Sequence, residues 1–79
     1  MRLSDLSRSA SALVTAVDAV GADDPIAQRL RALGFVDGET VRLITTGPFG
    51  ADPILVQVGF TRFALRRSEA ARVRVELTA

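Results

Sequence analysis

Apolar and polar residues alternate along the second half of the chain. Alternation at every second residue is typical of strands that bury one face. It predicts four strands, over residues 40–46, 53–59, 62–67 and 72–77. In the last of these we expect Val73, Val75 and Leu77 to face inward, with charged residues between them in water.

Residues 23–35 have the end signals of a helix. Asp24 stands at the N-cap position, and Pro25 follows at the first helical position, where its missing N–H has no cost. Gly34 supplies the left-handed residue that ends many helices, and Phe35 is placed for the hydrophobic contact that accompanies such an ending.

The same helix has two predicted faces. Ile26, Leu30 and Leu33 are spaced i, i+4 and i+7, which predicts one buried stripe. Arg29 and Arg31 lie off that stripe and should be exposed. We regard this exposed face as a candidate contact surface.

Residues 11–20, "SALVTAVDAV", fit two structures equally well. Leu13, Val14, Val17 and Val20 match a helical stripe. Several of these residues are β-branched, however, and β-branched residues favour a strand. The pattern alone leaves both alternatives open. Residues 2–8, "RLSDLSR", fit either one helical turn or an extended arm.

The stretch "TTGPFGADPILV", residues 45–56, raises the question of a phosphate-binding loop. Such a loop ends in Gly-Lys-Ser/Thr and opens a helix, whereas here a strand follows and the chain contains no lysine. A hairpin between two strands fits better, with Pro48 and Gly50 in the turn. Phe49 then lies at the tip, where it either folds over the open end of a barrel or contacts a partner; folding over is slightly favoured.

The remaining turns complete a single-domain prediction for residues 1–79. Gly38 is free to adopt the turn in "VDGE", and Ser68 is a candidate cap in the short turn over residues 68–71. Short strands with closely spaced turns and one helix predict a mostly β fold, a small bent antiparallel barrel. No stretch approaches the length of a membrane span, so we expect a cytoplasmic protein.

Composition removes most enzyme chemistries. The chain has no histidine, no cysteine and no lysine, so neither a typical transition-metal site nor a common general base is available. The neighbouring acids Asp23 and Asp24 more often cap a helix than bind a cation. We therefore expect no metal site, no cofactor and no catalytic residue. One indirect route remains, in which an arginine enters the active site of a GTPase.

Five arginines lie within thirteen residues near the C-terminal end: Arg62, Arg66, Arg67, Arg72 and Arg74. A solvated outer face is the favoured interpretation. If they form one patch, an acidic protein partner is more plausible than RNA, because no aromatic residues are interleaved for base stacking.

The ordered set "RLRALGFVDGETVRLI", "GPFGADPILVQV" and "FALRRSEAARVRVEL" resembles the FeoA family, over residues 12–77. These are small cytoplasmic proteins that accompany the bacterial ferrous-iron transporter FeoB. The residues that carry the resemblance include Gly34, Gly38, Pro48, Gly50, Pro53, Leu65, Arg66 and Arg67. Ala51 departs from the pattern, because a second glycine often stands there.

The resemblance implies an SH3-like barrel of about five strands with one inserted α-helix. It implies that residues 11–20 form a strand that pairs late in the chain. It also implies a non-enzymatic regulator that contacts the cytoplasmic GTPase part of FeoB. Candidate contacts are Pro48 and Phe49 at the hairpin tip, Arg29 and Arg31 on the helix, and Arg66 and Arg67. The alternatives are a GTPase-activating partner with Arg66 or Arg67 as a finger, and a nucleic-acid or metal-repressor-type SH3-like module.

Overall fold

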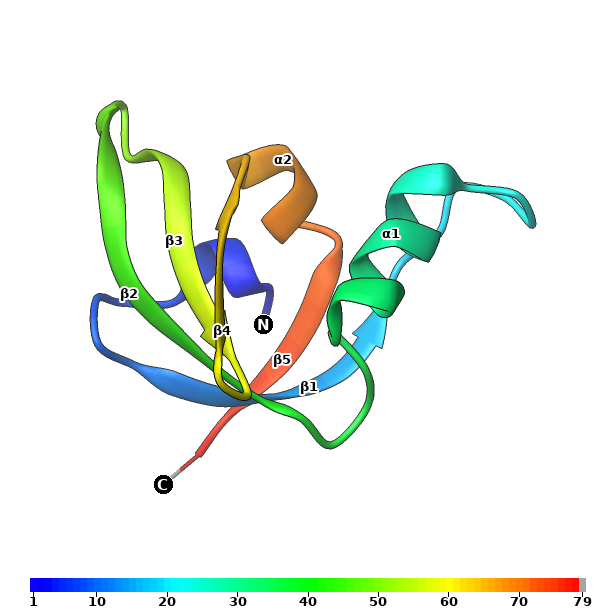
Figure 1. Cartoon of the computed structure of the whole chain (residues 1–79), viewed down its shortest axis with the longest axis horizontal. Helices are drawn as coiled ribbons and strands as arrows, with labels where there is room; N and C mark the ends of the chain where they lie inside the picture. The colour runs from blue at the N-terminus through cyan, green and yellow to red at the C-terminus, as the bar shows by residue number, and fades with distance from the viewer. Residues whose placement is uncertain (79) are drawn as a thin grey trace.

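The computed structural model describes residues 1–78 and shows five antiparallel strands bent into a small barrel, with α1 beside it (Figure 1). The sheet order is β4-β3-β2-β1-β5. The elements are the 3-10 turn η1 (Leu3–Asp5), β1 (Ser11–Val17), α1 (Pro25–Leu33), β2 (Thr40–Phe49), β3 (Asp52–Val58), β4 (Thr61–Leu65), α2 (Arg67–Ala70) and β5 (Val73–Leu77).

In the segment with two interpretations, residues 11–20, Ser11–Val17 form strand β1, and residues 18–20 lie outside it. It pairs with β2 on one side and with β5 on the other, where Val14 lies opposite Val75 and Val17 opposite Val73. The strand implied by the family resemblance is confirmed, and so is its late pairing. Because β1 joins the two halves of the sheet, its valines point into a shared core rather than along one helix face.

The N-terminal arm covers the outer edge of β5. Residue Val75 donates its N–H to the carbonyl of Met1 at 2.9 Å, and Arg2 pairs with Arg74 as an isolated bridge. The carboxylate of Asp18 forms ion pairs with both arginines. The hydrogen bond from Arg2, followed by that from Arg74, lowers the pKa of Asp18. An edge that is covered in this way is unavailable for pairing with other chains.

The core is aliphatic, as the composition predicts. Its largest side chain is Phe35, which is fully buried and packs against the half-buried Phe63 with ring centroids 6.1 Å apart. The other buried side chains are Leu3, Leu6, Ala12, Val14, Val17, Ala27, Leu30, Val41, Leu43, Ile54, Val56, Val58, Leu65, Ala70, Val73 and Val75.

Both predicted ends of α1 are confirmed. The Asp24 carboxylate accepts the N–H groups of Ile26 and Ala27, at 3.0 and 3.3 Å. It also accepts the N–H of Val20 at 2.9 Å and pairs with Arg72. These bonds, led by the one from Val20, lower the pKa of Asp24 to about 2.

At its other end, α1 stops in a Schellman motif. Gly34 has a φ of 114°, its N–H bonds to the carbonyl of Arg31, and the N–H of Phe35 bonds to the carbonyl of Leu30, both at 3.1 Å. Phe35 is thereby directed into the core, which explains how a residue just outside the helix becomes the largest buried side chain.

Two inward-facing predictions are wrong. Ile26 is 37% exposed, and the residues of α1 that are buried are Ala27 and Leu30, with Leu33 half-buried. The small Ala27 is buried in place of Ile26, whereas Leu30 and Leu33 of the predicted stripe remain on the buried side. Leu77 is 60% exposed because it ends β5 beyond the core layer formed by Val73 and Val75.

Candidate functional site

The β2–β3 hairpin projects from the barrel as a long ribbon (Figure 1). Its turn consists of Gly50 and Ala51, which both have positive φ, 63° and 64°. Positive φ at both central residues is the pattern of a type I′ turn, whose twist matches that of the strands. The predicted hairpin is therefore confirmed, with the turn placed at Gly50 and Ala51 rather than at Pro48.

A bulge lies just before this turn. Between the pairs Thr46–Ile54 and Phe49–Asp52, β2 advances three residues while β3 advances two. The extra residue belongs to the Gly47–Pro48 segment. A side chain at Gly47 would lie 2.6 Å from the carbonyl oxygen of Asp52, so glycine is required there by close backbone contact.

Phe49, the last residue of β2, points into solvent. Its side chain is 81% exposed. The favoured expectation that it folds over the open end of the barrel is therefore wrong. The bulge and the tight turn hold the tip of the ribbon away from the core, and the other end of the barrel is filled by Phe35 and its neighbours.

A pocket of about 340 Å³ lies beside the exposed ring, and we call it the hairpin pocket. It is lined by Phe49, Asp52, Pro53 and Arg66. Three of these lie around the turn, and the fourth comes from the segment between β4 and α2. The pocket combines two apolar rings with one guanidinium and one carboxylate.

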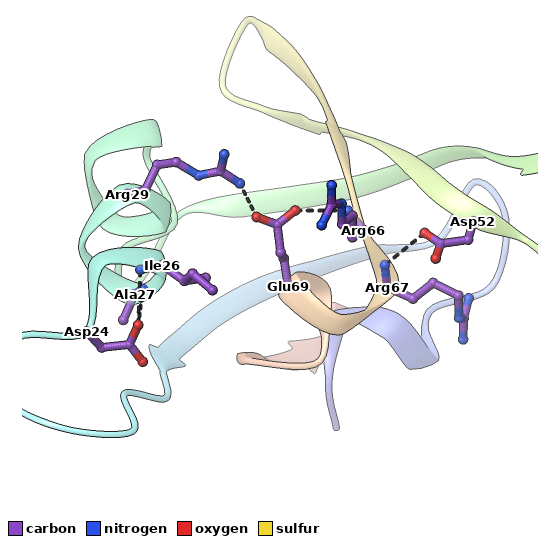
Figure 2. A network of polar contacts seen from close by, with 8 residues as sticks. All are labelled: Asp24, Ile26, Ala27, Arg29, Asp52, Arg66, Arg67 and Glu69. Carbon is purple, nitrogen blue, oxygen red and sulfur yellow. Dashed lines mark hydrogen bonds and ion pairs between the residues drawn. The ribbon is translucent and has the colours of Figure 1, made fainter.

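The backbone of Arg66 is hydrogen-bonded to a side chain of α2. Glu69 accepts the N–H of Arg66 at 3.0 Å through one carboxylate oxygen and binds the Arg29 guanidinium of α1 through the other (Figure 2). The expected cap of this short helix, Ser68, is thus wrong, because Glu69 takes that role from the third helical position. The Arg66 side chain itself is exposed.

Both the backbone and the side chain of Arg67 form hydrogen bonds. Its N–H donates to Oδ1 of Asp52 at 3.0 Å (Figure 2), and its guanidinium donates to the carbonyl of Ser4 at 3.0 Å. These bonds join α2 to the base of the hairpin and to the N-terminal arm. Of the two neighbouring arginines, Arg66 is the one whose guanidinium faces solvent at the pocket.

The two predicted contact residues of α1 are exposed but have partners within the chain. Arg29 pairs with Glu69, as described above, and Arg31 donates to the carbonyl of Val17 at 3.1 Å. Arg29 therefore fastens α1 to α2, and Arg31 fastens α1 to β1. Neither side chain lines the hairpin pocket.

The C-terminal arginines do not act as one patch. Arg72 pairs with Asp24, Arg74 pairs with Asp18, and Arg62 donates to the side-chain oxygen of Gln57 at 3.3 Å. Each is engaged on a different element. The favoured interpretation, a solvated outer face, agrees with this dispersal better than a nucleic-acid surface does.

One exposed aromatic residue, Phe60, was not among the candidate contact residues predicted from the sequence. Phe60 is completely exposed in the two-residue turn between β3 and β4. The turn begins with Gly59, whose φ is 59°, and Gly at the first position of a two-residue hairpin is itself a turn signal. That signal in "VGFTR" places Phe60 at a tip.

Within residues 1–78, no group of three or more His, Cys, Asp or Glu side chains is arranged to hold a metal ion. No helix in that range is both long enough and apolar enough to cross a bilayer.

Comparison with known proteins identifies relatives over nearly the whole chain. The FeoA domain family matches residues 1–77. A fusion of Fe(2+) transport protein A with the Fe(2+) transporter FeoB from Porphyromonas gingivalis is 32% identical over 77 residues. The match covers 98% of this chain but only 9% of that relative.

Solved structures agree with this result. The FeoA of Stenotrophomonas maltophilia, an SH3 domain protein crystallised with zinc, is 59% identical, with a TM-score of 0.88 over 96% of this chain and 89% of that chain. The FeoA protein of Chlorobium tepidum is 34% identical, with a TM-score of 0.87 over 100% of this chain and 71% of that one. The small barrel is therefore SH3-like.

Proposed function

The chain belongs to the FeoA domain family, and we propose on this basis that it is an accessory protein of a FeoB-type ferrous-iron transporter. It acts in the cytoplasm, without catalysis of its own, by contact with the GTPase part of the transporter. The observation that carries the proposal is the relative in which the two proteins form one chain. Proteins that are fused in one organism commonly act together where they are separate.

The hairpin pocket supports the proposal that the tip of the β2–β3 hairpin contacts the transporter. Phe49 exposes an aromatic ring at the end of a rigid turn, and aromatic residues and arginine are the residue types that most often dominate binding energy at interfaces. Pro48 and Arg66 flank the ring. Arg29 and Arg67 support it from behind, through Glu69 and Asp52.

The test is direct association. Purified chain should bind the cytoplasmic part of FeoB from the same organism, measured by calorimetry with the GTPase loaded with GDP and with a non-hydrolysable GTP analogue. Full-length transporter in detergent serves as the second partner. Absence of binding to both partners in every nucleotide state rejects the proposal.

Activation of GTP hydrolysis is the second candidate, and one observation favours it. The Arg66 guanidinium is exposed and forms none of the ion pairs found among residues 1–78. An arginine supplied in trans accelerates hydrolysis by about 10³–10⁵ in known GTPases. The hydrolysis rate at saturating chain decides this, because an unchanged rate excludes activation while leaving the accessory role intact.

A further inference from the structure

We propose that the hairpin pocket binds an extended partner segment in which an apolar side chain stands next to a carboxylate. The proposal rests on the accessory function above for the source of that segment, which is the cytoplasmic part of FeoB. It adds the chemistry that is recognised. The apolar side chain covers the rings of Phe49 and Pro53, and the carboxylate pairs with Arg66.

The apolar half of the pocket is held in place before any partner arrives. Phe49 and Asp52 are paired across the two-residue turn, so the backbone that carries the ring is held at the end of the strand ladder. Pro53 has a rigid ring and follows directly in β3. An aromatic ring with two rotatable bonds loses little conformational entropy on contact. Such a surface favours an apolar side chain over water.

The charged half favours a carboxylate. The pocket lining contains one cation, Arg66, and one carboxylate, Asp52. The neighbouring guanidinium groups are engaged elsewhere, that of Arg29 by Glu69 and that of Arg67 by the carbonyl of Ser4. The carboxylates of Asp52 and Glu69 already accept backbone N–H groups at 3.0 Å. The Arg66 guanidinium is left as the cation that faces the pocket.

Asp52 limits where the partner's carboxylate can lie. It lines the same pocket, so a second carboxylate close to it would be repelled. The partner's acid must therefore be on the side of Arg66. The remaining oxygen of Asp52 suits a backbone N–H of the partner, which fits an extended segment whose N–H groups are unpaired.

The chain offers a matched control at the other end of β3. Phe60 is even more exposed than Phe49, and Arg62 lies two residues after it. The Arg62 side chain, however, donates to Gln57, and the pocket on that side is lined by Ser11, Gly38, Glu39, Thr40, Arg42, Gln57 and Gly59. The same two residue types are thus present without an apolar pocket between them.

The first experiment measures binding of the FeoB cytoplasmic part to variants. We expect Phe49→Ala and Arg66→Glu each to weaken binding by about tenfold or more, with Arg66→Lys intermediate. Phe60→Ala and Arg62→Glu should stay within about twofold of the unmodified chain. Thermal unfolding of every variant is measured in parallel, so that a folding defect is not read as lost contact.

The second experiment does not need FeoB. Two synthetic peptides, one alternating leucine with glutamate and one alternating leucine with lysine, are titrated into isotope-labelled chain. The glutamate peptide should shift the amide signals of residues 49–52 and Arg66, and the lysine peptide should not. Arg66→Glu should reverse this preference.

The outcomes separate the two proposals. If the unmodified chain binds FeoB but only Phe60→Ala and Arg62→Glu weaken it, the pocket assignment is overturned and the accessory function stands. If the chain does not bind FeoB at all, the accessory function fails and the peptides alone decide on the pocket. Equal shifts by both peptides, or shifts located at β4, overturn the pocket assignment.

Discussion

The two hairpins at the ends of β3 expose a phenylalanine each and differ in almost everything that surrounds it. Phe49 precedes a turn in which both central residues have positive φ, whereas Phe60 lies inside a turn in which only Gly59 does. The first pattern is that of a type I′ turn and the second that of a type II′ turn. Phe49 is therefore the last paired residue before its turn, whereas Phe60 is a central residue of its turn and lies beyond the paired strands.

The support behind each ring differs as well. Asp52 ties the first hairpin to α2, and Glu69 ties the start of α2 to α1. Among residues 1–78, the hydrogen bonds of the second hairpin are those between its own strands and those of Gln57 with Arg62 and Gly59. Exposure alone would rank Phe60 above Phe49. The surrounding contacts, rather than exposure, indicate which one is arranged as a binding surface.

The largest expected difference between the hairpins is steric. Gly47→Ala places a Cβ 2.6 Å from the Asp52 carbonyl oxygen, so the bulge must move, and we expect the free energy of unfolding to fall by about 2–3 kcal/mol. Gly59→Ala meets no atom within 4 Å and has only its φ of 59° to accommodate, at about 1 kcal/mol. Urea unfolding measures both. Equal losses would show that the first hairpin is not tightly constrained.

Acid should lower the free energy of unfolding through a third region, around Asp24 at the start of α1, which contains neither hairpin. The pKa of Asp24 is about 2 in the folded chain, below its ordinary value of 3.8, so the unfolded chain takes up a proton more readily. The stabilisation from Asp24 is complete above pH 3.8 and is lost as the pH falls toward 2. Asp18, whose pKa is also lowered, adds to the same trend.

Denaturant midpoints measured between pH 5 and pH 2 should therefore decline, and Asp24→Asn should flatten the decline. Asparagine keeps the helix cap but cannot titrate. A decline that is the same in the variant would assign the acid sensitivity to other carboxylates, including those of the hairpin side.

Removing Glu69 tests the support behind Arg66. Glu69→Ala leaves the Arg66 N–H without its acceptor and removes the ion pair with Arg29, so we expect a loss of about 1–2 kcal/mol in unfolding free energy. Glu76→Ala, on the exposed face of β5, is the control and should change it by less than about 0.5 kcal/mol. Equal effects would show that the contacts of Glu69 add nothing to the frame.

Most of the framework was predictable because it depends on local rules. The helix ends were set by Asp24 and Gly34, and the strands by strict alternation, as with Val73 and Val75. The burial of Ala27 in place of Ile26 was not predictable, since it depends on how α1 packs against the barrel. Leu77 obeyed the alternation but lies past the end of the core, and no pattern along the chain reveals where a core ends.

The site was less predictable than the fold. The sequence indicated Phe49 and Arg66 separately, but it gave no sign that they line one pocket, because that contact depends on how α2 docks beside the hairpin. It equally could not show that Arg67 turns to the N-terminal arm, 63 positions away. Pairings over such distances are products of tertiary packing.

A substitution in the turn of the first hairpin should produce a small gain in stability. Ala51 has a φ of 64°, a region that residues with a side chain seldom adopt. Ala51→Gly relieves this strain but also makes the unfolded chain more flexible, so we expect a net gain of about 0.5 kcal/mol. The measurement is again urea unfolding. A net loss would mean that the turn tolerates alanine well and that the first hairpin is more adaptable than its φ angles indicate.

The smallest expected effect is the loss of either phenylalanine ring. Since both rings are exposed, Phe49→Ala and Phe60→Ala should each change the free energy of unfolding by less than about 0.5 kcal/mol. Had Phe49 covered the barrel end, its truncation would cost about 3–5 kcal/mol. A large loss of unfolding free energy for Phe49→Ala alone would therefore show that the ring is part of the core and not part of a contact surface. Equal, small changes leave partner binding as the property by which the two hairpins differ.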